Sequence, residues 1–241
     1  MKLLLLLATL CLSCSTSYAD TFELRSPVEK ISKALSSTER QVRAAAVKVV
    51  TPRGGHGTGS LIKYKDLTLV FTAKHVANDP IGTTYLITKN NNQSTAALIY
   101  QSDTADIAVL ILNTDFRDKN IKPMDWDITS DYDIGKGIVY SGYPSSHKLM
   151  SFNGRIVGYE TDRHGTQLIV NTYGWFGCSG SVIYDEKGTI IGILYGVDVE
   201  YHPGIQINEN MIWVAPIKHI DMQEVLKPLC RGTLKKYKAC Q

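Results

Sequence analysis

Long apolar runs, an excess of charge of one sign and metal-binding motifs are all missing from this sequence of 241 residues. The longest apolar run, residues 3–12, is about half the length of a membrane-spanning helix, which needs roughly 20 residues. The formal net charge is only +3, so electrostatics gives no reason to expect nucleic acid or a membrane as partner. Cysteine and histidine do not occur at zinc-binding spacing, and no Gly-Lys-Ser/Thr follows the glycine-rich residues 54–57. We therefore expect neither a metal nor a cofactor.

The first residues have the order of a secretory signal. Lys2 supplies a positive start, residues 3–12 are apolar, and residues 17–19 read Ser-Tyr-Ala, a small-x-small cleavage site. This order predicts a signal peptide over residues 1–19, cleaved after Ala19, and hence a secreted or periplasmic protein. Loss of Lys2 lowers the formal charge from +3 to +2.

Three cysteines remain after cleavage: Cys178, Cys230 and Cys240. An oxidising compartment allows Cys230 and Cys240 to close a short C-terminal loop, although two free thiols in a frayed tail would fit the sequence too. The sequence does not determine the oligomeric state.

Residues 20–43 form an N-terminal segment with a helical pattern. Ser26 can cap a helix, Pro27 suits its first turn, and Glu29 completes a capping box. This short helix could pack on the rest of the protein or belong to a removable pro-segment.

From Ala44 onward the sequence consists of short β-type runs separated by glycine and polar turns. This texture favours an all-β barrel or sandwich over alternating strands and helices. One late helix is expected at residues 220–226, ended by Pro228. The β-type runs are residues 47–50, 67–71, 97–100, 107–112, 137–140, 167–170, 181–184, 189–195 and 211–214.

Ser179 lies in a Gly-Cys-Ser-Gly-Ser motif at residues 177–181. Glycines on both sides allow a tight turn in which the amides of Gly177 and Ser179 could hold an oxyanion while the serine attacks a carbonyl. By itself, such a motif is more often a plain turn between strands.

A nucleophilic serine needs a base, and the base needs a carboxylate to orient it. His75 ends an apolar run, and Asp106 stands at the start of another. Asp103 is the competing carboxylate, but its surroundings are those of a solvated turn.

Three blocks, residues 72–75, 106–110 and 177–181, resemble those of the trypsin/chymotrypsin-like serine peptidases, which carry His, Asp and Ser in this order. Residues 57–62, 142–144 and 192–196 resemble further strands of the same family, in its compact bacterial-type branch. The resemblance covers about residues 44–217.

The resemblance implies two six-stranded antiparallel β-barrels, at residues 44–118 and 119–217, with a cleft between them and a C-terminal helix and tail at 218–241. It implies a serine endopeptidase in which Asp106 orients His75 and His75 activates Ser179, through an acyl-enzyme intermediate. A polypeptide substrate would pair as a strand beside residues 194–197.

Some positions depart from the family pattern. Cys178 replaces an aspartate that pairs with a new N-terminus in digestive members, so we expect it to be a packing residue. Tyr173, at the base of the substrate pocket, does not support cleavage after Arg or Lys. With Tyr195 and Gly196 as further substrate-binding residues, Val197 would narrow the pocket toward small or medium apolar side chains. The motif also resembles the glutamyl endopeptidase branch, but the histidine which that branch needs on the pairing strand is missing.

Two rival interpretations compete with a peptidase. An α/β-hydrolase would need Gly-x-Ser-x-Gly, whereas Ser181 replaces the last glycine, and its triad follows another order. The alternative of a different class is a catalytically silent relative that binds peptides or proteins.

Overall fold

The computed structural model describes residues 34–162, 165–201, 203–231 and 238–240. The chain divides into two units, Met1–Ala34 and Leu35–Gln241, and both barrels belong to the second. The predicted signal peptide and the start of the predicted helix at Ser26 lie outside the described residues.

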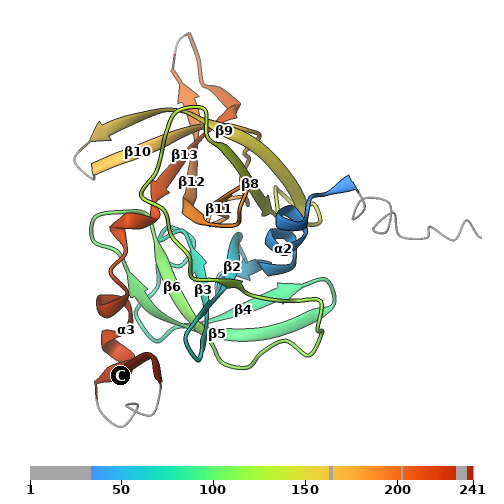
Figure 1. The fold of residues 1–241 in the computed structure, drawn as a ribbon, viewed down its shortest axis with the longest axis vertical. Coiled ribbons are helices and arrows are strands. Elements are labelled where there is room, and N and C mark those ends of the chain that lie inside the picture. Colours follow the sequence, from blue (N-terminus) through green and yellow to red (C-terminus); the bar gives the residue numbers. More distant parts are fainter. Residues whose placement is uncertain (1–33, 163–164, 202, 232–237, 241) are drawn as a thin grey trace, which may run out of the picture. The chain divides into compact units, whose positions relative to one another are not determined.

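The first barrel closes on itself in the order β1-β4-β5-β6-β3-β2, with β2 pairing back to β1 (Figure 1). All pairs within this ring are antiparallel, and the short β7 (Met124–Asp125) adds to β2 in parallel. The six strands of the ring are β1 (Ala46–Val50), β2 (His56–Tyr64), β3 (Leu67–Thr72), β4 (Thr84–Lys89), β5 (Asn92–Gln101) and β6 (Ala108–Leu112).

The second barrel closes in the order β10-β13-β12-β11-β8-β9. The expected all-β fold of two six-stranded, chymotrypsin-like barrels is thereby confirmed. Its strands are β8 (Gly137–Gly142), β9 (Met150–Asp162), β10 (Gly165–Asn171), β11 (Val182–Asp185), β12 (Ile190–Glu200) and β13 (Gln206–Pro216).

Helix α2 (Ser37–Ala45) occupies residues at which we expected the first strand to begin, since that strand starts at Ala46 and not at Ala44. Its N-terminus is a capping box in which Ser36 and Glu39 each accept a hydrogen bond from the other's backbone N–H. At the other end the Lys89 ammonium donates to the carbonyls of Arg43 and Ala46, which ties the helix to β4.

The predicted C-terminal helix is present as α3 (Met222–Cys230), but the expectation that Pro228 ends it is wrong. Proline removes one backbone hydrogen bond, yet the helix continues for two residues because Leu229 packs into the core. Cys230 and Cys240 form a disulfide in the structure, so the alternative of two free thiols does not hold. Such a short loop stabilises by about 2–3 kcal/mol, chiefly by restricting the unfolded chain.

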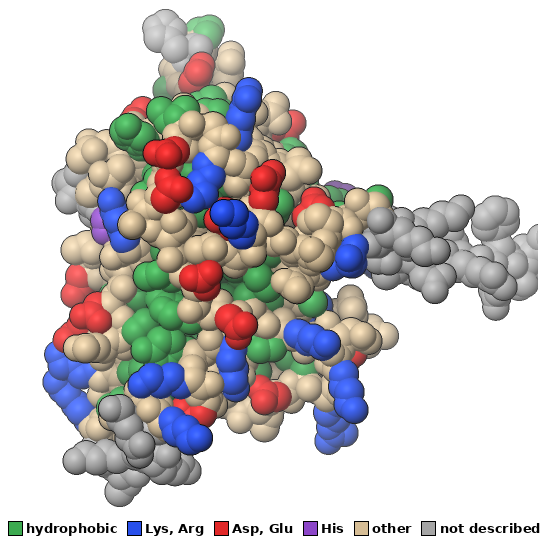
Figure 2. All heavy atoms as spheres, viewed as in Figure 1, with side chains coloured by type: hydrophobic (Ala, Val, Ile, Leu, Met, Phe, Trp, Pro, Cys, Tyr) green, Lys and Arg blue, Asp and Glu red, His purple; other side chains and the backbone are tan. Residues whose placement is uncertain are grey.

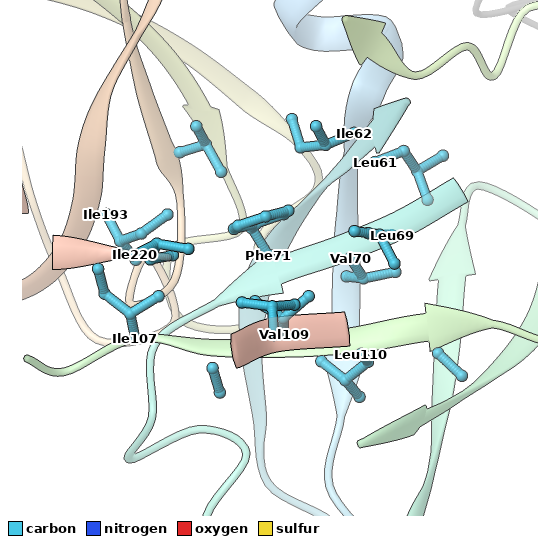
Figure 3. Packing of buried hydrophobic residues seen from close by; sticks show 14 of the residues in the cluster. Leu61, Ile62, Leu69, Val70, Phe71, Ile107, Val109, Leu110, Ile193 and Ile220 are labelled. Carbon is cyan, nitrogen blue, oxygen red and sulfur yellow. The ribbon is translucent and has the colours of Figure 1, made fainter. Parts of the chain in front are cut away.

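The larger core cluster spans both barrels and α3. Figure 3 shows Ile193 of the second barrel and Ile220 lying beside Phe71 and Ile107 of the first. A buried hydrogen bond of 2.7 Å also crosses the junction, between the hydroxyls of Ser60 on β2 and Tyr184 on β11.

The molecular face in Figure 2 has interspersed acidic and basic side chains, with no extended region of one sign. Over the described part of the chain, no helix has the length and apolar character needed to cross a membrane.

The Ser60–Tyr184 bond should appear as coupling in a double-mutant cycle measured by urea unfolding. Tyr184→Phe and Ser60→Ala each leave a buried hydroxyl without its partner, so we expect each to cost about 1–3 kcal/mol of unfolding free energy. The double variant leaves no orphan and should cost clearly less than the sum of the two. Additive costs would mean that this bond does not link the barrels.

Candidate active site

Strand pairing brings His75 and Asp106 together. Thr72 at the end of β3 pairs with Ala108 at the start of β6, so His75 lies just beyond one strand and Asp106 just before the other. Both carboxylate oxygens of Asp106 accept from the same residue. The His75 backbone N–H donates to Oδ1 at 2.9 Å, and His75 Nδ1 lies 2.8 Å from Oδ2.

Together, these contacts affect the pKa of the Asp106 carboxyl more strongly than its burial does. Desolvation by itself would raise the pKa of this carboxyl, but hydrogen bonds and charge from His75, with the Lys74 amide, hold its pKa below the usual range. Asp103, the competing carboxylate, is exposed and takes no part in the pair. The structure therefore favours Asp106 as the partner of His75.

Ser179 lies in the segment between β10 and β11, and this segment is pressed against the first barrel. The Ser179 carbonyl accepts from Thr58 N at 2.8 Å. Gly180 has φ of +90°, and a Cβ there would lie 2.1 Å from the Thr58 carbonyl and 2.8 Å from the Ala73 nitrogen. Only glycine fits such a position, which brings the Ser179 segment against the residues that immediately precede His75.

Thr58 is a hub of hydrogen bonds at the junction. Besides its N–H bond to Ser179, its hydroxyl donates to the Gly177 carbonyl at 2.7 Å and accepts from Tyr143 N at 3.0 Å. Its carbonyl accepts from the Thr72 hydroxyl at 2.7 Å. One fully buried residue of β2 thus connects the ends of β3 and β8 with the serine segment.

The peptide between Phe176 and Gly177 is oriented by Ser145. The Ser145 N–H donates to the Phe176 carbonyl at 2.6 Å, and Ser145 itself has φ of +48°, in the left-handed region. Because the C=O and N–H of a trans peptide point to opposite sides, this bond directs the Gly177 N–H away from Ser145. Gly177 has φ of +94°, and a Cβ there would lie 2.4 Å from the Tyr143 carbonyl.

Cys178 is fully buried and carries no disulfide, which agrees with the expectation of a packing residue. Burial raises the pKa of its thiol. A protonated, inaccessible thiol is not a nucleophile at neutral pH.

Tyr173, six residues before Ser179, belongs to an aromatic stack. The Tyr173 ring stacks on Phe152 at 5.4 Å between centroids, and Phe152 stacks on Tyr140 at 4.9 Å. A Cβ on Gly174 would meet Ile212 Cγ2 at 2.2 Å and Val197 Cγ1 at 3.2 Å. Ile212 therefore packs directly against Gly174, a contact that no local sequence motif indicates.

Two adjoining cavities run along β12 from His75. The first, of about 390 Å³, is lined by His75, Asp106 and Tyr195, with Gln167. The second, of about 310 Å³, shares Tyr195 and Gln167 with the first and continues to Gly196, Val197, Trp213 and Glu160. The predicted residues Tyr195, Gly196 and Val197 thus line one cleft, whereas Gln167, Trp213 and Glu160 come from other strands and were not identified from the sequence.

The arrangement gives no sign of a metal centre, because the described ranges contain no group of three or more His, Cys, Asp or Glu side chains that could hold one.

Comparisons with known proteins agree with this geometry. The sequence profile of the trypsin-like peptidase domain matches residues 57–193, more than half of the chain. The glutamyl endopeptidase of Staphylococcus epidermidis is 26% identical over 190 residues, covering 72% of this chain and 67% of that protein.

Solved structures of proteases are similar in fold, among them the following two. The active form of the Rv3671c protease from M. tuberculosis aligns with a TM-score of 0.59 and 17% identity, covering 80% of this chain and 83% of that one. The HtrA-type protease AlgW with a tripeptide gives a TM-score of 0.60 at 18% identity, covering 75% and 58% respectively. At such identities the likeness concerns the fold alone.

The lowered pKa of Asp106 makes the His75–Asp106 pair a source of stability that depends on pH. Because the folded pKa lies below the unfolded value of about 3.9, the contribution is present above that pH and is lost as pH falls through the folded pKa. We expect the difference in unfolding free energy between the wild type and Asp106→Asn to shrink as pH is lowered from 5 to about 2.5.

Chemical denaturation across this range measures the difference. Asp103→Asn is the matched control, since it removes an exposed carboxylate outside the hydrogen-bonded pair and should change stability little at any pH. A constant Asp106→Asn difference down to the lowest pH would contradict the assignment.

Proposed function

The chain belongs to the trypsin-like peptidase domain family, a family of serine endopeptidases, and on that premise we propose that it hydrolyses peptide bonds with Ser179 as nucleophile, His75 as base and Asp106 as the orienting carboxylate. The observation that carries the proposal is the His75–Asp106 pair, bonded at 2.8 Å, beside which the Ser179 segment is packed through Thr58 and Gly180.

The proposed reaction follows from these roles. His75 Nε2 takes the hydroxyl proton of Ser179 as the serine oxygen attacks the peptide carbonyl. Asp106 stays ionised, accepts a hydrogen bond from His75 Nδ1–H and stabilises the imidazolium. The same proton then passes to the departing amine, and water hydrolyses the acyl-enzyme by the reverse sequence of transfers.

The backbone amides of Gly177 and Ser179 would stabilise the tetrahedral oxyanion. Support for this comes from Ser145, whose hold on the Phe176 carbonyl turns the Gly177 N–H to the opposite side. Donors fixed before the substrate arrives need no reorganisation during the reaction, and this is the source of their catalytic effect.

For the residue before the cleaved bond we propose a preference for small or medium apolar side chains. Val197 and Ile212 pack against Gly174 and would limit the depth of the substrate pocket, and the stacked Tyr173 offers no carboxylate for a basic side chain. The relative from S. epidermidis is a glutamyl endopeptidase, but residues 193–197 of β12 include no histidine to receive a glutamate. The substrate would pair along Tyr195, Gly196 and Val197 as an added strand.

We further propose that the protein is secreted or periplasmic, with residues 1–19 as a signal peptide cleaved after Ala19. The order of charge, apolar run and small residues supports this. Its partner would be a polypeptide substrate, with no role for nucleic acid or a membrane after processing.

Replacing Ser179 tests the reaction directly. Residues 20–241 would be incubated with a proteome-derived peptide library, and the cleavage sites read by mass spectrometry. We expect Ser179→Ala to lower kcat by about 10⁴-fold or more, and a fluorophosphonate to label only the protein that retains Ser179.

Ser181→Ala is the matched control, because the Ser181 hydroxyl is buried without a hydrogen-bond partner among the described residues and should be dispensable. The sites cut would reveal the preferred side chain at the same time. No cleavage and no labelling of the folded wild type would favour the alternative, a silent relative that binds peptides.

Thr58 should prove to be a positioning residue. Thr58→Val removes the hydroxyl that bonds Gly177 and Tyr143, and we expect kcat to fall by about 10- to 100-fold with little change in KM, since only the oxyanion donors lose their support. Thr58→Ser keeps the hydroxyl and should retain most of the activity. Equal losses in both variants would assign Thr58 a packing role only.

A further inference from the structure

We propose that a basic crevice on the leaving-group side of the cleft, formed around Lys48, His147 and Lys148, binds an acidic side chain of the substrate two or three residues after the cleaved bond. The crevice has a volume of about 320 Å³ and lies between the first barrel and the segment that connects β8 to β9. This inference rests on the proposed function and extends it to a substrate class.

Strand register locates the crevice relative to Ser179. Lys48 on β1 pairs directly with Thr58 on one side and with Thr88 on the other, so these three side chains project from the same face of the sheet. Thr58 bonds the Ser179 segment, whereas Lys48 and Thr88 line the crevice. The crevice therefore begins one strand away from the residue that holds the serine segment.

The direction of the substrate places the crevice on the leaving-group side. The Ser179 segment bonds β12 through Gly180 N and Leu194 O at 2.7 Å, and the acyl half would pair with that strand. Gly177, three residues earlier in the same segment, contacts Thr58 and Tyr143 instead, and Tyr143 is also part of the crevice wall. A leaving group that moves away from β12 thus passes toward the crevice.

Distances set which substrate residue reaches it. Neighbouring strands are about 4.8 Å apart, so Lys48 and Thr88 stand about 5 and 10 Å beyond Thr58. An extended peptide advances about 3.3 Å per residue, so the second and third residues after the cleaved bond come within reach of a lysine side chain.

The charges of the crevice call for an anion. Two lysines and a histidine line it, and no carboxylate does so among the described residues. Within the described ranges, neither Lys48 nor Lys148 forms an ion pair. Lys48 is half-buried, and its ammonium lies 5.3 Å from the centre of the Tyr143 ring, which holds the charge at the crevice wall.

The acyl side of the cleft carries the opposite charge. Its two cavities are lined by Asp103, Asp106 and Glu160, and the single lysine there, Lys74, already donates to the Ser102 carbonyl at 2.5 Å. An acidic side chain is therefore attracted to one side of the cleaved bond only.

The test compares quenched fluorescent peptides that share one acyl half and carry Asp, Asn or Lys at the second and third positions after the bond. We expect the wild type to cleave the Asp peptide with a kcat/KM about fivefold above that of the Asn peptide. In Lys48→Gln/Lys148→Gln this ratio should fall to about one, with cleavage of the Asn peptide unchanged. Lys122→Gln removes an exposed lysine outside the crevice and should keep the wild-type ratio.

An unchanged ratio in the double variant, or no preference in the wild type, would overturn the proposal. If no peptide is cut, the proposed function fails. A separate binding measurement then tests whether the crevice binds an acidic side chain. The labelled leaving-group half would then be titrated into Ser179→Ala by fluorescence anisotropy. Tighter binding of the Asp form, lost with the two lysines, supports the crevice, and equal binding of Asp and Asn forms overturns it.

Discussion

Thr58 makes four hydrogen bonds from one fully buried position, and the placement of Ser179 relative to His75 depends on them. A buried hydroxyl or amide without a partner costs about 1–3 kcal/mol, so each partner of Thr58 is held where that cost is avoided. The partners come from both barrels. The junction is therefore fixed by satisfied polar groups and not by apolar packing alone, which would tolerate small sliding movements.

The junction between the barrels also depends on a close approach of backbone segments. Gly180 and Gly177 both adopt positive φ, and any side chain on them would collide with the carbonyls of Thr58 and Tyr143. The glycines that flank Cys178 and Ser179 are thus required for contact between the barrels as well as for the turn itself. Ser145 pays a related conformational cost, since a non-glycine residue in the left-handed region is strained, and in return its N–H orients the Phe176–Gly177 peptide.

Features of the fold and the site could be predicted from the sequence where short, local motifs encode them. The two barrels, the His75–Asp106 pair and burial of Cys178 followed from short blocks and from a family resemblance. Strands β4 and β9 were missed, and the capping box at Ser36 and Glu39 went unnoticed although its signal was present. The packing of Ile212 against Gly174 and the hub at Thr58 could not be derived, because they arise from the register of strands far apart in sequence. The prediction that Pro228 ends the C-terminal helix was wrong because the burial of Leu229 outweighed the loss of one hydrogen bond.

The two sides of the cleft have different physical origins, which explains why their charges can be set independently. The acyl side is built on β12 and on the turn before β6, whereas the leaving-group side is built on β1, β4 and the segment after β8. A substrate carboxylate bound in the crevice would lie on the far side of Thr58 from Asp106, so the lysines could hold it without its competing with Asp106 for His75. Screening lengths of about 8 Å at physiological salt keep the two fields largely separate. The charges of such a cleft can therefore select the direction in which a peptide binds. The packing of Val197 and Ile212 against Gly174 would select the residue before the cleaved bond.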